Sequence, residues 1–280
     1  MSGKGATPTM MSNAAAQSRS YAPFLRRVLV LEATQLAARL PSEVLKDLGA
    51  SRSYTETADA KALALCKQLD PQLIVTELTG PTLDGLRFVR QLRRSSLACR
   101  ARPVIVIAGE PTAASIISAR NSGVHEFLAK PFTIRDLTRR LEAVMLHRRD
   151  WIEAVNYVGP DRRRFNSGDY HGRRKRQTDT PELGPNDRVE QALRILASAI
   201  RAIETDPGQS LRAMQAQADA LQAVAVGTGD INLMNGAAQL QRCLTQAVSN
   251  GALSRAAIEG SAADLLSRLP PEPRAAFELT

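Results

Sequence analysis

The sequence predicts an α/β fold: a doubly wound, five-stranded parallel sheet, followed by a basic linker and a small all-α region. Two observations support this. Short apolar runs alternate with helical patterns five times between Arg27 and His147, and the composition changes beyond Trp151. Such alternation is typical of a parallel sheet with helices on both faces. Sheets of this kind bind ligands at the carboxyl ends of their strands, so we expect a site there.

The strands are predicted from short, continuous apolar runs, which indicate strands covered on both faces. The clearest runs are residues 28–31, 73–75 and 104–107, and residues 52–57 and 126–129 are weaker candidates. Helical patterns fill the intervals and end at residues that stop helices, such as Gly49. Pro41 falls inside the first helical pattern, residues 36–48, and should kink or shorten that helix.

The composition beyond the α/β region predicts a flexible basic linker and then helices. Residues 162–176 hold seven Arg or Lys residues and one acidic residue, and the segment as far as about residue 186 is polar with scattered Gly and Pro. Apolar stripes at helical spacing follow, which favours a small bundle or a dimerisation unit. The predicted organisation is a disordered tail at 1–26, the α/β domain at 27–148, the linker at 149–186, the helical region at 187–269 and a tail at 270–280.

Bulk properties exclude several classes of protein. The 280 residues are 44% hydrophobic with a formal net charge of +9, and no apolar run approaches the length of a membrane span. The N-terminus has no apolar segment typical of a secretory signal. Three scattered cysteines argue against a disulfide framework or a zinc site and suit a reducing cytosol. We therefore expect a cytoplasmic protein that does not contact membranes.

Three motifs show a family resemblance. The segment LIVTELTGPTLDG (residues 73–85), the strand PVIVIAG (103–109) and the segment FLAKPF (127–132) occur in this order at suitable intervals. With the alternating pattern, they resemble a response-regulator receiver domain of the CheY-like type, which has a flavodoxin-like fold. The resemblance covers roughly residues 27–147, a little under half of the chain.

The resemblance implies a role for each position of a phosphorylation site. In this family an aspartate ending the third strand accepts a phosphoryl group, and an acidic pair after the first strand helps to hold Mg²⁺. A Thr or Ser after the fourth strand and a Lys after the fifth contact the phosphoryl oxygens. The Lys position is Lys130, and Phe127 occupies the position of the aromatic switch residue. The resemblance also implies a cis peptide at Lys130-Pro131.

Three positions depart from the family pattern. The acceptor position is Glu77, the acidic pair is reduced to Glu32 followed by Ala33, and the hydroxyl position is Ala108. Glu77 places its carboxylate roughly 1.5 Å further out, about one C–C bond, which misaligns in-line attack. Glu32 and Glu77 are the carboxylates left for a metal. Mg²⁺ binding should therefore be weak or lost, and we expect no cofactor.

The altered pocket leaves two interpretations open. Glu77 and Lys130 can form a fixed ion pair that partly imitates a phosphorylated site, or the pocket is degenerate and has no signalling state. The corresponding function is a pseudo-receiver in a bacterial two-component phosphorelay that binds a histidine kinase or a downstream regulator, with homodimerisation left open. A second hypothesis is a receiver still phosphorylated at Glu77.

A third hypothesis is a nucleic-acid-binding regulator that uses the basic linker, in which Phe165 and Tyr170 are interleaved, with the helical region. A solvated linker explains the same residues and is the preferred interpretation. An enzymatic output is not expected, because no nucleophile–base, metal or nucleotide motif follows residue 150. The histidines are His125, His147 and His171, all before the helical region, which excludes histidine phosphotransfer there.

Overall fold

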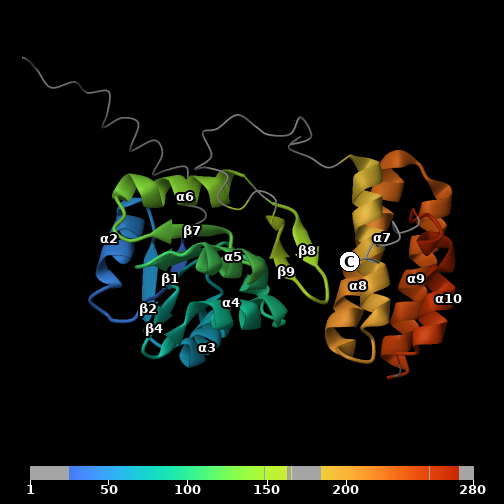
Figure 1. Cartoon of the computed structure of the whole chain (residues 1–280), viewed down its shortest axis with the longest axis horizontal. Coiled ribbons are helices and arrows are strands. Elements are labelled where there is room, and N and C mark those ends of the chain that lie inside the picture. Colours follow the sequence, from blue (N-terminus) through green and yellow to red (C-terminus); the bar gives the residue numbers. More distant parts are fainter. Residues whose placement is uncertain (1–24, 148, 163–164, 166–183, 252, 271–280) are drawn as a thin grey trace, which may run out of the picture. The chain divides into compact units, whose positions relative to one another are not determined.

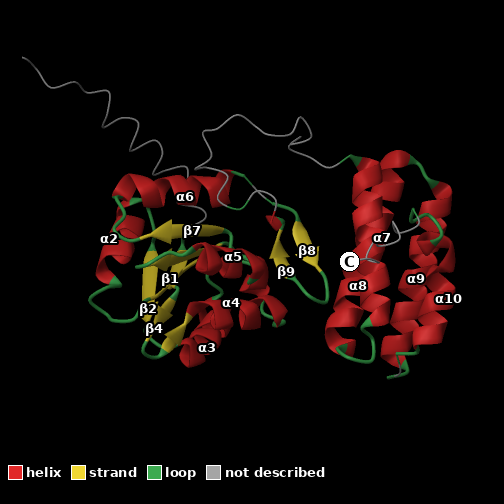
Figure 2. Ribbon diagram, in the orientation of Figure 1, coloured by secondary structure: helices red, strands yellow, loops and turns green. Residues whose placement is uncertain are grey.

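The computed structural model describes residues 25–147, 149–162, 165, 184–251 and 253–270 (Figure 1). These residues form two compact units. The first unit runs to Ile152 and resumes at Tyr157, and the second holds residues 153–156 together with the helices from residue 184 onward. The first unit mixes strands and helices, whereas the regular elements described between residues 184 and 270 are all helices (Figure 2). No helix in the described part of the chain is long and apolar enough to cross a membrane.

A five-stranded parallel sheet forms the centre of the first unit, in the order β2-β1-β3-β6-β7. All five predicted strands are present, including the two weaker candidates. Their bounds are β1 (Arg27–Leu31), β2 (Arg52–Glu56), β3 (Leu73–Glu77), β6 (Val104–Ala108) and β7 (Glu126–Ala129). The register pairs Val30 with Val75, and Val75 with Ile105, so the apolar runs lie side by side in the centre of the sheet.

Helices cover both faces of this sheet, as the alternating pattern predicts. The helices are α2 (Arg39–Asp47), α3 (Asp59–Leu69), α4 (Gly85–Arg94), α5 (Ala113–Asn121) and α6 (Ile134–Leu146). Val28 and Val30 pack into one buried cluster with residues of α2 and α6. Leu29 and Leu31, which point to the opposite face, pack into a second cluster with residues of α3, α4 and α5. The fold is therefore the predicted doubly wound α/β fold.

Smaller elements complete the first unit. The strands β4 (Thr79–Gly80) and β5 (Leu83–Asp84) form a short antiparallel pair, and the 3₁₀ helix η2 (Ala98–Ala101) precedes β6. The helix α2 begins only two residues before Pro41, so this proline lies in the first turn and the helix is shorter than its pattern, as predicted. Leu25, placed by prediction in the N-terminal tail, is fully buried in the core, and residues 1–24 lie outside the described part.

The predicted flexible linker is wrong for residues 151–160. They form a two-stranded sheet of β8 (Trp151–Glu153) and β9 (Val158–Pro160), and all three residues of β9 are buried. Strands of three residues are too short to show alternation in a sequence, which explains the error. Residues 166–183 of the predicted linker lie outside the described part of the chain.

A buried arginine lies beneath this pair of strands in the first unit. Arg93, at the end of α4, is 1% exposed and donates hydrogen bonds to the carbonyl oxygens of Gly123 (2.9 Å) and Arg102 (2.9 Å). A further bond joins its guanidinium to the carbonyl of Arg100. The same guanidinium lies 5.4 Å from the ring centroid of Trp151. Arg93 thus connects three segments of the first unit that are distant in sequence.

The second unit is a bundle with its own apolar core. Its described helices are α7 (Pro185–Arg201), α8 (Pro207–Thr228), α9 (Ile231–Ser249) and α10 (Arg255–Leu266). Leu196, Met214, Leu221, Leu240 and Leu265 are buried together in this core, which accounts for the predicted stripes. The helix α8 begins after Asp206, whose side chain caps the helix by accepting from the N–H of Gln209 at 3.0 Å.

Residues 153–156 belong to the second unit through buried polar contacts. The Nε2 atom of Gln209 donates to Oε1 of Glu153 at 3.0 Å and to the carbonyl of Ala154 at 3.2 Å. Gln217 donates to the backbone carbonyl of Glu153 at 3.1 Å, and Val155 packs against the core of the bundle. The sequence pattern of the helices alone did not indicate this segment.

Candidate functional site

Two acids and a lysine meet at the carboxyl edge of the parallel sheet. Glu32 follows β1, Glu77 ends β3 and Lys130 follows β7, and parallel strands bring these ends to one edge. The Nζ atom of Lys130 lies 2.8 Å from Oε1 of Glu77 and 2.9 Å from Oε2 of Glu32. One ammonium group therefore bridges both carboxylates, and the predicted ion pair between Glu77 and Lys130 is present.

Both oxygens of the Glu77 carboxylate accept hydrogen bonds. Oε1 accepts from Lys130, and Oε2 accepts from the backbone N–H of Ala33 at 2.8 Å. In the sequence Ala33 stands out only as a missing carboxylate, and this bond from its backbone was not predicted. Because the longer Glu side chain reaches across the strand ends, it can contact the backbone after β1 as well as the lysine after β7.

The electrostatics favour an ionised Glu77. Burial alone would raise the pKa of Glu77, but the hydrogen bonds from Lys130 and Ala33 outweigh it and hold this pKa below its ordinary value. Burial likewise opposes the charge of Lys130, yet bonds to Glu77 and Glu32 raise its pKa above the ordinary value. The pair is thus charged throughout the neutral pH range.

Glu32 differs because it is fully buried. Its side chain has 0% exposure, and its Oε1 atom accepts no hydrogen bond from the described residues. Burial raises the pKa of Glu32 to about 7, and the nearby Glu77 carboxylate adds to the increase, although the bond from Lys130 opposes it. When both acids are ionised, one ammonium faces two carboxylates; protonation of Glu32 leaves a neutral cluster.

The other predicted pocket positions lie on the neighbouring strands β6 and β7. Ala108 ends β6, is 1% exposed and accepts the backbone N–H of Lys130 at 2.7 Å through its carbonyl. Phe127 is buried in the same apolar cluster as Ala108. The peptide bond between Lys130 and Pro131 is cis, as the resemblance implied. Ala108 thus presents a methyl group where a receiver of the resembled family has a hydroxyl.

A glycine at the start of α4 makes the close approach to β3 possible. A Cβ atom on Gly85 would lie 2.1 Å from the carbonyl oxygen of Glu77, so a side chain is excluded there. The preceding residue, Asp84, caps α4 by accepting from the N–H of Arg87 at 2.8 Å. Asp84 and Gly85 therefore set the approach of the helix to the strand that carries Glu77.

The residues proposed for nucleic-acid binding lie partly within the described chain. Arg162 stacks over the ring of Tyr157 at 4.5 Å and donates to Oδ1 of Asn121 at 3.0 Å. Phe165 packs against the apolar core of the first unit rather than standing free for a base to stack on, which corrects that expectation. Tyr170 and the remaining cations of the stretch lie outside the described residues.

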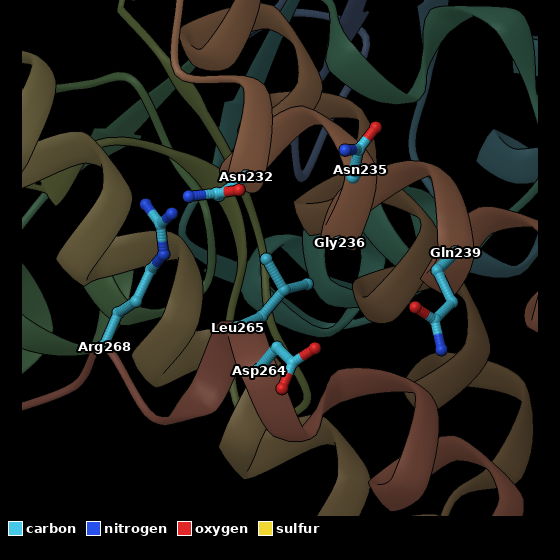
Figure 3. A pocket seen from close by; sticks show the side chains of 7 residues that line it. All are labelled: Asn232, Asn235, Gly236, Gln239, Asp264, Leu265 and Arg268. Atoms are coloured by element: carbon cyan, nitrogen blue, oxygen red, sulfur yellow. The ribbon is translucent and has the colours of Figure 1, made fainter.

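A shallow hollow of about 260 Å³ lies between α9 and α10 of the second unit (Figure 3). Its polar lining includes Asn232, Asn235 and Gln239 from α9, Asp264 from α10, and Arg268 just after α10. Arg268 is already bound to Asp230 at 2.7 Å. The hollow shares no residue with the acid–lysine cluster of the first unit.

A doubly wound sheet with acids after β1 and β3 and a lysine after β7 defines a class of signal-receiving domains, and comparisons with known proteins agree. The sequence profile of the response regulator receiver domain matches residues 28–142. Those residues are a response regulator receiver domain of a two-component system.

Individual relatives cover the same share of the chain. Chemotaxis protein CheY-3 of Vibrio cholerae is 25% identical over 118 residues, which are 42% of this chain and 90% of the relative. KDP operon transcriptional regulatory protein KdpE of Escherichia coli is 31% identical over 121 residues, 43% of this chain and 52% of the relative. Among solved structures, that of the chemotaxis protein CheY4 of Vibrio cholerae matches 43% of this chain and 99% of its own, at 22% identity and a TM-score of 0.40.

The residues of the pocket do not fit a magnesium ion. Mg²⁺ requires several oxygen ligands in near-octahedral geometry. Glu32 and Glu77 both bind the ammonium of Lys130, and the side chain of Ala33 offers only a methyl group. Across the described chain, no group of three or more His, Cys, Asp or Glu residues is placed to hold a metal ion. The ammonium of Lys130 offsets the negative charge of these carboxylates.

Proposed function

We propose that the chain is an atypical response regulator whose receiver domain signals without being phosphorylated. It acts in the cytoplasm by protein–protein contact, with a histidine kinase or a downstream regulator as its partner, and it catalyses no reaction of its own. The observation that carries this proposal is the bridge from Lys130 to both Glu77 and Glu32. In this view the bridge from Lys130 to the two carboxylates holds the pocket in one conformation, as a phosphoryl group and its metal ion do in a phosphorylated receiver.

The proposal rests on what phosphoryl transfer needs. The attacking carboxylate oxygen must be free and aligned with the leaving group, and charge on the phosphoryl oxygens must be offset by cations and hydroxyl donors. Both oxygens of Glu77 are engaged, at 2.8 Å each. Ala108 supplies no hydroxyl, and the donor set does not suit Mg²⁺. Each of these features separately lowers the rate of acyl phosphate formation.

Incubation with acetyl phosphate and Mg²⁺, followed by intact-mass measurement, tests the proposal. We expect the wild-type chain to gain no phosphoryl mass. The matched control is the triple variant Glu77→Asp, Ala33→Asp, Ala108→Thr, which restores the family pattern in the same fold and should gain one phosphoryl group. A stable phosphoryl mass on the wild type that disappears in Glu77→Gln would instead favour a working receiver.

The partner interaction distinguishes a signalling pocket from a degenerate one. A pull-down compares the wild type with Glu77→Ala, which removes one of the two carboxylates that Lys130 bridges while leaving the exposed faces of the helices unchanged. Reduced partner recovery with Glu77→Ala is expected if the bridge holds the binding conformation. Equal recovery would mean that the altered pocket does not control binding.

A further inference from the structure

Two cysteines far apart in the sequence lie together in the first unit. Cys66 is in the last turn of α3 and Cys99 is in η2, and each is 1% exposed within the same apolar cluster. The Sγ atom of Cys99 lies 3.7 Å from the backbone carbonyl oxygen of Cys66. This contact brings the Cys99 sulfur against the backbone from which the Cys66 side chain leaves. Both are free thiols.

The two thiols are also unequal in acidity. A hydrogen bond between the side chains raises the pKa of Cys66, and burial adds to the increase. The same bond lowers the pKa of Cys99, and burial only partly opposes this decrease. The buried cation of Arg93 lowers the pKa of Cys99 further and partly offsets the increase at Cys66. Cys99 is therefore the nucleophile of the pair and Cys66 the partner that retains its proton.

We propose that Cys66 and Cys99 form a redox-active dithiol that a small peroxide converts to a disulfide. The Cys99 thiolate attacks one peroxide oxygen and breaks the O–O bond, giving a sulfenic acid and, with one proton, water. The Cys66 sulfur then attacks the sulfenic sulfur, forming the S–S bond and releasing a second water as its thiol loses its proton. The two thiols are oxidised by two electrons, and hydrogen peroxide is reduced to two waters.

The element that carries Cys99 is suited to admit a small oxidant. The helix η2 has only four residues, and Ala98 and Ala101 on either side of the cysteine are exposed. A short 3₁₀ segment opens more readily than a core strand, because it has few backbone bonds to break. A peroxide is small enough to enter through such an opening, whereas a bulky disulfide oxidant needs a larger one.

Oxidation of Cys66 and Cys99 would affect the backbone carbonyls that accept hydrogen bonds from Arg93. The carbonyls of Arg100 and Arg102, directly after Cys99, accept hydrogen bonds from Arg93, which also faces the ring of Trp151. A disulfide would tie the loop that carries these carbonyls to α3. The redox state of the pair would thereby set the rigidity of the segment that leads from η2 into β6.

Peptide mapping of the full chain tests this proposal on the wild type itself. The protein is treated with hydrogen peroxide, its remaining thiols are alkylated under denaturing conditions, and it is digested with trypsin. We expect the peptides of residues 62–67 and 95–100 to appear as one disulfide-linked species that a reductant separates. Cys243 should remain free to alkylate. Peroxide-treated protein without this linked species, or with Cys99 linked to Cys243, would overturn the proposal.

Two variants check the assigned roles. Cys66→Ala should leave the oxidised Cys99 as a sulfenic acid that dimedone traps, because the resolving thiol is gone. Cys243→Ser is the matched control and should form the 62–67 to 95–100 link as the wild type does. Loss of the link in Cys243→Ser would mean that the observed pairing depends on the third cysteine, which contradicts a dithiol built by the fold.

Discussion

The Nζ atom of Lys130 lies 2.8 Å from Oε1 of Glu77, and these residues are 53 positions apart in the sequence. The side chains are largely buried, with exposures of 29% for Lys130 and 15% for Glu77. A pair at this depth is screened less by solvent than a surface ion pair. The contact therefore contributes to the stability of the strand ends, in addition to its role in shaping the pocket.

Replacing Lys130 by Met should destabilise the receiver domain in a pH-dependent manner. Loss of the ammonium leaves two neighbouring carboxylates without their shared cation, one of them fully buried. The free energy of unfolding should fall by about 2–4 kcal/mol at pH 8. At pH 5 the loss should be smaller, because a protonated Glu32 removes one of the two charges. Urea unfolding at both pH values measures the difference.

The control for this change is Lys46→Met, at an exposed position in α2. Its effect should stay within roughly 0.5 kcal/mol at both pH values, as is usual for exposed substitutions. An equal loss for Lys130→Met and Lys46→Met would show that the bridge adds nothing to stability.

Glu32 should make the stability of the domain fall as the pH rises. Its pKa is raised from 4.5 to about 7 in the folded chain, so the folded state holds this proton more tightly than the unfolded state. The contribution to stability is complete below about pH 4.5 and is lost as the pH rises towards 7. The integrated effect is roughly 1–3 kcal/mol.

Glu32→Gln removes this proton-binding site while keeping an oxygen that can accept from Lys130. We expect the variant to gain stability relative to the wild type as the pH rises from 5 to 8, measured by urea unfolding. Glu43→Gln, at an exposed position in α2, should retain the wild-type pH dependence. If Glu32→Gln and the wild type show parallel curves, Glu32 is not the titrating group.

The sequence predicted the sheet and the ion pair between Glu77 and Lys130 because both depend on patterns that a single chain displays. The apolar runs at residues 28–31 and 104–107 have no other stable environment than a covered sheet, and the residues that end such strands must share an edge. The sequence alone therefore predicts that Lys130 and Glu77 lie close together. The bond from the Ala33 N–H to Glu77 was missed, because backbone groups carry no signal in the sequence.

Contacts between short or irregular segments were also missed. The strands β8 and β9 have three residues each, which is too few for periodicity to show. Cys66 and Cys99 are 33 positions apart without a recognisable spacing, so only the packing of η2 against α3 reveals their proximity. In each case the stabilising partner belongs to a different segment, and only the three-dimensional fold brings the two together.

Arg93→Met should strongly destabilise the first unit. The substitution keeps an apolar stem of similar length but leaves three carbonyls without this donor, that of Gly123 in a buried position and those of Arg100 and Arg102 in partly buried ones. Unsatisfied buried acceptors cost about 1–3 kcal/mol each, partly offset because a buried cation is also removed. We expect a net loss of roughly 3–5 kcal/mol by urea unfolding.

The control is Arg120→Met, an exposed position on α5 that removes the same charge. It should change the free energy of unfolding by no more than roughly 0.5 kcal/mol. Similar small effects of Arg93→Met and Arg120→Met would contradict a structural role for the buried guanidinium. Trp fluorescence offers a second readout, since Trp151 is the single tryptophan and lies over the Arg93 side chain.

Gly123→Ala should release β9 from the first unit, because Gly123 has no room for a side chain. Its φ angle of 87° lies in the left-handed region, and a Cβ atom there would lie 2.5 Å from the carbonyl oxygen of Val158. We expect a loss of about 2–4 kcal/mol in the free energy of unfolding, with increased proteolysis near residues 157–160. Gly109→Ala is the matched control, since a Cβ atom at Gly109 meets nothing within 4 Å. Unchanged proteolysis in Gly123→Ala would mean that the packing of β9 does not depend on this close approach.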